Sequence, residues 1–118
     1  MGLTEEWLDN DFITNVQKRG QEIIQAMQKS SAASAANATC DHVRDLWLGT
    51  EPGRHVSMAV TSDGNPYGVP EGLIFSFPVT IKNQEWTIVP GLNINSFSRD
   101  KINKSADELV EERTMAFQ

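Results

Sequence analysis

The first third of the chain carries hydrophobic residues at every third or fourth position. This spacing places one apolar stripe on a helix from about Phe12 to Gln28. Asp9, Asn10 or Asp11 is the expected N-cap, because a short polar side chain there accepts a hydrogen bond from a free backbone N–H. The stripe consists of Ile13, Val16, Gly20, Ile23, Ile24 and Met27.

A second helical pattern follows almost at once in "SSAASAANATCDHVRDLWLG". Ser30 and Ser31 are the expected caps, and Gly49 suits the position just past the last turn. Small residues fill the first half of the apolar face, which predicts tight helix packing or, as an alternative, a ligand close to the backbone. Asp41, Arg44 and Asp45 are expected in surface ion pairs. The apolar face consists of Ala32, Ala36, Thr39, Cys40, Val43, Leu46 and Trp47.

In the middle of the chain the hydrophobic period changes to two, which indicates half-buried strands. The predicted strands are Val56–Thr61, Leu73–Ile81 and Glu85–Val89. The segment Lys82–Gln84 is short enough for a hairpin turn. Pro78 has no N–H for a ladder, so it is expected at a sheet edge or a bulge.

The last helix is expected to begin at Ser105, because Ser105 and Glu108 match a capping box. Its predicted buried side consists of Ala106, Leu109, Val110, the Arg113 stem and Phe117. The element order is then helix, helix, three strands, helix. We therefore expect an α+β fold with helices packed on a small antiparallel sheet, in a single domain over residues 1–118.

The net charge of −6 and the pI of about 4.8 exclude some classes of partner. Nucleic acids and anionic membranes are recognised through clustered Lys and Arg, and here these residues are scattered among acids. No apolar run approaches the roughly 20 residues of a membrane span. The single cysteine cannot form an internal disulfide, which fits a reducing compartment.

The sequence Cys40-Asp41-His42 brings together a thiol, an acid and a base. Adjacent helical residues point about 100° apart, so these three cannot form a hydrogen-bonded triad. Cys40 is expected to be a buried thiol on the apolar face. His42 and His55 have no second ligand at metal-binding spacing, so no metal site is predicted, and His55 is expected to be exposed.

The loop "SDGNPYGVPEG" is rich in glycine and proline, as phosphate-binding loops and active-site lids can be. A phosphate loop joins a strand to a helix N-terminus, whereas this loop joins two predicted strands. Asp63 and Glu71 are its only charged residues. The glycines and prolines are therefore interpreted as turn residues without a direct chemical role.

Four segments carry a resemblance to a known family: "FITNVQKRGQEIIQA", "SSAASAANATCDHVRDLWLGT", "VSMAVTSDGNPYGVPEGLIFSFPVTI" and "EWTIVPGLNINSFSRDKINKSADELVEE". In this order and spacing, from about Trp7 to Phe117, the chain resembles the C-terminal part of the cytosolic-type malate dehydrogenases. Lactate dehydrogenases share the architecture, but "SFPV" and "SSAASAA" are more similar to the malate branch.

The resemblance implies the C-terminal domain of a cytoplasmic, NAD-dependent oxidoreductase that converts malate and NAD to oxaloacetate and NADH, a reaction of malate metabolism and the tricarboxylic acid cycle. In that family the catalytic His, the substrate-binding Arg residues and the NAD-binding turn lie upstream of the matched region. The chain is therefore expected to be a fragment that binds no cofactor and is inactive alone. A homodimer, or association with a dinucleotide-binding domain, is the expected assembly.

The resemblance also implies a pocket wall beside the nicotinamide and the substrate, formed by Ser30, Ser31 and Ala32. A serine hydroxyl there can hydrogen-bond a carboxamide or a carboxylate. The alternative role for both serines is helix capping. Two other functions stay open: a non-catalytic protein that pairs with a full-length dehydrogenase subunit, and part of another 2-hydroxy-acid dehydrogenase.

Overall fold

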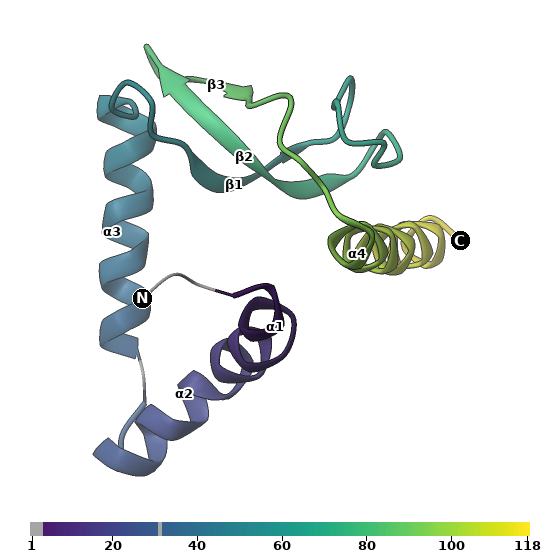
Figure 1. Cartoon of the computed structure of the whole chain (residues 1–118). Coiled ribbons are helices and arrows are strands. Elements are labelled where there is room, and N and C mark those ends of the chain that lie inside the picture. The colour runs from purple at the N-terminus through teal and green to yellow at the C-terminus, as the bar shows by residue number, and fades with distance from the viewer. Residues whose placement is uncertain (1–3, 31) are drawn as a thin grey trace. The chain divides into compact units, whose positions relative to one another are not determined.

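A computed structural model describes residues 4–30 and 32–118 of the chain. The chain divides into two compact units, the first ending at His42 and the second beginning at Val43. The first unit is helical, and the second holds the sheet and the C-terminal helix (Figure 1). Helix α3 (Ala32–Leu48) begins in the first unit and ends in the second.

One continuous helical segment makes up most of the first unit. It consists of α1 (Glu5–Trp7), a π-helical turn η1 (Leu8–Phe12) and α2 (Ile13–Met27). The helix ends where Gln28 adopts the left-handed conformation with φ of 52°. The predicted helix over residues 12–28 is therefore present, but it starts earlier.

The N-cap of this segment is Thr4, whose Oγ1 accepts a hydrogen bond of 3.2 Å from the Trp7 backbone N–H. Acidic residues occupy the turn that follows, where they interact favourably with the positive end of the helix dipole. The predicted caps Asp9, Asn10 and Asp11 lie inside the helical segment, so that prediction was wrong. Because Thr4 already caps the helical segment, no new helix begins at residues 9–11.

Helix α3 ends at the predicted glycine. Gly49 has φ of 88°, and its N–H donates to the Asp45 carbonyl over 3.0 Å. A Cβ at this position would lie 2.9 Å from the Ile81 carbonyl oxygen. Both the left-handed conformation and the close backbone approach therefore require glycine.

The second unit contains the predicted antiparallel meander. Strands β1 (Val56–Thr61), β2 (Ile74–Lys82) and β3 (Glu85–Ile88) lie in the order β1-β2-β3. Asn83 and Gln84 form the β2–β3 turn with φ of 54° and 67°, as the two-residue hairpins that match strand twist require. The predicted α+β class is confirmed.

Pro78 lies in the middle strand, opposite Ser57 of β1, and one residue before the part of β2 that pairs with β3. It is therefore paired on the β1 side and lies at the end of the ladder on the β3 side, so the expected edge position applies to one side of the strand only. The Pro78 carbonyl accepts a hydrogen bond of 2.8 Å from the Val89 N–H, on the β3 side. In such an antiparallel pair the Pro78 nitrogen would normally donate to the Val89 carbonyl. The Tyr67 hydroxyl donates to that carbonyl instead, and this explains how a central strand accommodates proline.

Helix α4 (Ser96–Ala116) starts nine residues before the predicted capping box. Asn95 is its N-cap, and the Asn95 Oδ1 accepts a hydrogen bond of 2.8 Å from the Ser98 N–H. Ser105 is exposed in the middle of the helix, so the predicted start was wrong. The polar sequence before Ser105 hid the first nine residues of the helix, because few apolar residues mark their buried side.

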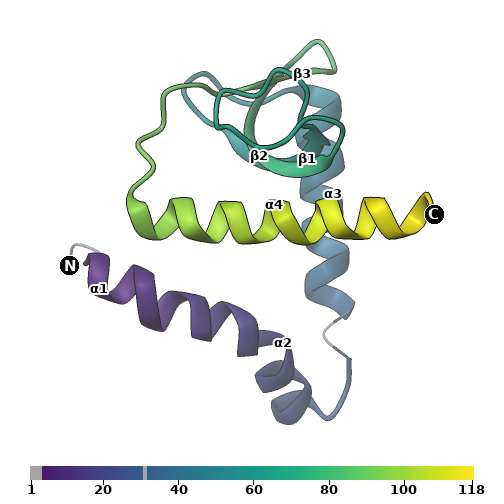
Figure 2. The same cartoon turned by 90° about the vertical axis from the view of Figure 1, so that its right-hand side faces the viewer.

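The core of the second unit lies between one face of the sheet and α4, which runs across that face (Figure 2). Ala106 is buried as predicted, Leu109 and Val110 pack half-buried against the core, and Phe117 is 86% exposed, contrary to prediction. The buried hydrophobic residues are Met58, Val60, Tyr67, Val69, Leu73, Phe77, Val79, Ile81 and Ala106.

Candidate functional site

Two of the three predicted pocket-wall residues are described, and they lie between the end of α2 and the start of α3. Ser30 precedes α3 and is exposed, and Ala32 is the first residue of α3 and is also exposed. Ser31 lies outside the described residues. The Ser30 hydroxyl is therefore accessible to a ligand, while the polar groups that would complete a pocket have to come from elsewhere.

The Cys40-Asp41-His42 sequence does not form a triad in the structure. Cys40 is exposed, contrary to the buried thiol that we expected. Asp41 accepts a hydrogen bond of 3.2 Å from the Asn37 amide, one helical turn earlier. His42 and His55 are both exposed, the latter as predicted. Cys40, Asp41 and His42 are consecutive residues of α3, so their side chains point in different directions around the helix.

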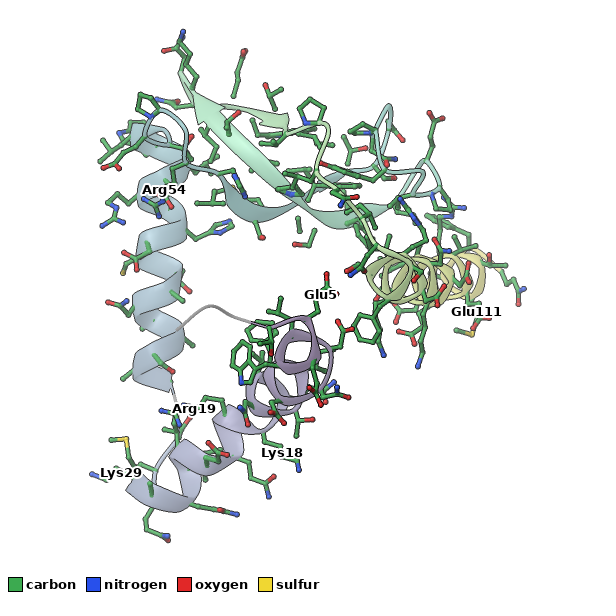
Figure 3. The ribbon with its side chains drawn as sticks, in the orientation of Figure 1. Glu5, Lys18, Arg19, Lys29, Arg54 and Glu111 are labelled. Atoms are coloured by element: carbon green, nitrogen blue, oxygen red, sulfur yellow. The ribbon has the colours of Figure 1, made fainter. Side chains whose placement is uncertain are left out.

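Asp45 is the one buried residue in the described part of α3, although we expected it at the surface. Its carboxylate lies 3.3 Å from the Arg54 guanidinium and 3.9 Å from that of Arg44. Arg54 lies beside the C-terminal part of α3 (Figure 3). This ion pair ties the turn before β1 to the helix. Across residues 4–30 and 32–118, no three His, Cys, Asp or Glu side chains gather in a way that suits a metal ion.

The glycine- and proline-rich loop between β1 and β2 is held by its own side chains. Asn65 donates to the carbonyls of Ser62 and Val69, and its Oδ1 accepts from the N–H groups of Tyr67 and Val69. The fully buried Ser62 hydroxyl donates to the Pro70 carbonyl over 2.7 Å and accepts a hydrogen bond of 3.0 Å from the N–H of Leu73, the residue before β2. These bonds occupy the backbone N–H groups of Tyr67, Val69 and Leu73, which are therefore not available to a phosphate.

Two arginines of α4 tie the helix to this loop. Arg99 donates to the Tyr67 carbonyl over 2.6 Å. Arg113 donates to the carbonyls of Glu71 and Gly72 over 2.9 and 3.1 Å. The loop is therefore a structural connection between the sheet and α4, which agrees with its interpretation as a turn.

Several large apolar side chains on the first two long helices are exposed. In α2, Val16 is 59% and Met27 61% exposed; in α3, Trp47 is 67% and Leu48 74% exposed. The spacing placed Val16, Met27 and Trp47 on apolar faces, and each of these side chains is exposed. No described helix is both long and apolar enough to cross a membrane.

The chain is similar to a known protein family over almost its whole length. The model of the lactate/malate dehydrogenase α/β C-terminal domain matches residues 2–118. The chain belongs to this family. Both compact units lie within the matched residues.

Relatives within the lactate/malate dehydrogenase family come from animals and plants. The chain is 58% identical over 114 residues to the cytoplasmic malate dehydrogenase of Felis catus and 56% identical to that of Homo sapiens. It is 58% identical over 113 residues to the Zea mays cytoplasmic malate dehydrogenase. These matches cover 96–97% of this chain but only 34% of each relative, so the chain spans about a third of their length.

Solved structures of family members have a similar fold. The malate dehydrogenase of Naegleria fowleri matches with a TM-score of 0.84 and 47% identity, over 97% of this chain and 36% of that one. A Trichomonas vaginalis lactate dehydrogenase in complex with NADH and oxamate matches with a TM-score of 0.86 and 29% identity, over 98% and 35%. The fold is thus common to both branches, whereas sequence identity is higher to the malate branch.

Proposed function

We propose that residues 1–118 form the substrate and dimerisation domain of an NAD-dependent malate dehydrogenase that acts in the cytoplasm. The parent reaction transfers a hydride from malate to NAD, which yields oxaloacetate and NADH. The observation that carries the proposal is 55–58% identity to proteins named cytoplasmic malate dehydrogenase, against 29% to the solved lactate dehydrogenase. The family match over both compact units supports treating the chain as one domain.

In this proposal the cofactor and the reacting His belong to the other part of the parent enzyme. The contribution of this chain is the wall formed by Ser30, Ser31 and Ala32. The accessible Ser30 hydroxyl fits a hydrogen bond to the nicotinamide carboxamide or to a substrate carboxylate. Such a bond positions a reactant and takes no part in the proton transfer itself.

Activity measurements test whether the catalytic groups lie outside this chain while the chain itself supplies a functional C-terminal domain. The isolated chain, mixed with oxaloacetate and NADH, should consume no NADH. A chimera in which this chain replaces the C-terminal third of the human cytoplasmic malate dehydrogenase should consume NADH. Activity of the chain alone, or a folded but inactive chimera, would contradict the proposal.

Substitutions in the chimera separate a pocket wall from a helix cap. Ser30→Ala and Ser31→Ala should lower kcat/KM about tenfold each if the hydroxyl bonds a charged or polar reactant. A cap alone would lower thermal stability by about 1 kcal/mol and leave kcat/KM unchanged. Ser105→Ala, at an exposed position in α4, is the control for loss of a serine hydroxyl.

A second candidate function is pairing with a full-length dehydrogenase subunit without catalysis. The exposed apolar side chains of α2 and α3 favour it, because contiguous apolar surface often marks an interface. Mixing the chain with a tagged full-length subunit and measuring complex formation by sedimentation tests this function. Absence of any complex at micromolar concentrations would exclude it.

A further inference from the structure

The β3-facing edge of the central strand is paired over only part of its length. The first six residues of β2 pair with β1, but only its last four pair with β3. In an antiparallel sheet, successive residues of a strand direct their N–H and C=O groups alternately to the two neighbouring strands. Pro78 directs its carbonyl to the β3 side, so Ser76, two residues earlier, directs its N–H and C=O there too. At Ser76 β3 has already ended, and among the described residues no backbone hydrogen bond outside the ladders involves Ser76.

A cavity of about 120 Å³ lies beside this open edge. Its walls come from β2, from the preceding loop, from the segment after β3 and from α4. None of the nine described residues that line it carries a charge, and the Tyr67 and Phe77 rings that form part of it are buried. The lining residues are Tyr67, Val69, Phe75, Ser76, Phe77, Pro78, Leu92, Ile94 and Ile102.

We propose that the Ser76 edge and this cavity, together called the β2 notch, bind an extended peptide segment with one uncharged apolar side chain. The peptide backbone pairs with the Ser76 N–H and C=O, as in the addition of a strand to a sheet edge. Its side chain enters the cavity, whose volume is close to the ~150 Å³ of an apolar cavity that holds benzene. A leucine side chain has a suitable size, and a charged side chain would lose its hydration without a partner.

This choice of ligand follows from two separate features of the β2 notch. An apolar molecule without amide groups would fill the cavity but leave the Ser76 donor and acceptor unused. A polar peptide would pair with the edge but leave the cavity empty. Only an extended segment with an apolar side chain satisfies both, and this inference is independent of the proposed dehydrogenase function.

Two peptides test the proposal on the full 118-residue chain. Acetyl-Thr-Leu-Thr-amide is titrated into ¹⁵N-labelled protein, and amide shifts are followed by NMR. The amides of Ser76, Leu92 and Ile94 should shift in a saturable way. Acetyl-Thr-Gly-Thr-amide keeps the backbone but lacks the side chain, so it should bind at least about tenfold more weakly. Equal affinity of the two peptides, or shifts confined to α2 and α3, would overturn the proposal.

Substitutions at Ser76 isolate the contribution of its backbone. Ser76→Pro removes the N–H that faces the β2 notch but leaves the bonds to β1, because those come from neighbouring residues. It should weaken the leucine peptide about fivefold, while the matched Ser76→Ala should leave affinity unchanged. Should Ser76→Pro fail to fold, Ile102→Trp fills the cavity from α4 and should abolish the shifts. Unchanged binding by a folded Ser76→Pro, or by Ile102→Trp, would refute the assignment.

Discussion

The Tyr67 hydroxyl supplies a hydrogen bond that proline cannot make. It donates to the Val89 carbonyl opposite Pro78 and also accepts from the Leu92 N–H over 3.4 Å. Tyr67→Phe should leave the Val89 carbonyl without this donor and lower the free energy of unfolding by about 1–3 kcal/mol. Urea denaturation measures the change.

A second substitution separates the lost bond from other effects of the phenylalanine. Pro78→Ala restores an N–H opposite Val89, so it should recover part of the stability lost in Tyr67→Phe. Ser57→Ala, which removes an exposed hydroxyl from the other face of the sheet, is the control and should change stability by less than about 0.5 kcal/mol. Simple additivity of the Tyr67 and Pro78 changes would contradict the substitution of one donor for the other.

The Tyr67 hydroxyl shows how the chain accommodates Pro78 next to the end of the β3 ladder. The rule that proline avoids central strands assumes that the opposite carbonyl stays unpaired. The compensating hydroxyl lies 22 residues from Val89 along the chain, and local sequence gives no sign of it. Asp45 is a similar case, because its burial depends on Arg54, which lies in another element.

At the scale of elements, two residues could have marked the start of α4: Asn95, which caps it, and Ser105, the first residue of the predicted capping box. Asn95→Ala should lower the free energy of unfolding by about 1 kcal/mol, because Asn95 caps the helix. Ser105→Ala should be neutral or slightly stabilising, since alanine has the higher helix propensity in mid-helix. Chemical denaturation of both variants checks this. The reverse order of effects would mean that the helix begins at the capping box after all.

The elements that were predicted correctly are those with local signals. Alternation defined the three strands, the short Lys82–Gln84 segment defined the hairpin, and Gly49 marked the end of α3. The start of α4 was missed because "SFSRDKINK" is polar and Asn95 acts through a single cap bond. The capping box at Ser105 had the right residues, but it lies inside a helix that had already begun.

At the scale of the whole molecule, the exposed apolar faces predict its behaviour in solution. Val16, Met27, Trp47 and Leu48 each expose more than half of their surface. The isolated chain should therefore bind a hydrophobic dye such as ANS, or associate at micromolar concentrations. Fluorescence and sedimentation measure both effects. A monomer that does not bind the dye would mean that these faces are covered within the chain itself.

Sequence periodicity could predict which face of α2 and α3 is apolar, but not what covers it. An apolar stripe is compatible with a core, with an interface or with another domain, and only the partner surface distinguishes them. Local sequence could not predict the candidate pocket wall either. Ser30, Ser31 and Ala32 were selected through a family resemblance, because an exposed serine before a helix has no local signal that separates a ligand contact from a cap.

The hydroxyl at Tyr67 also affects how this region appears in a hydrogen-exchange experiment. An ordinary bonded pair in an antiparallel ladder contributes two backbone amide protons that exchange slowly. At the Pro78–Val89 pair one amide is missing, and the bond that replaces it uses a phenolic proton, which exchanges too fast to be recorded. Deuterium uptake at the Pro78–Val89 pair is therefore reported through the Val89 amide alone. Protection counted per amide then understates the number of hydrogen bonds at this pair.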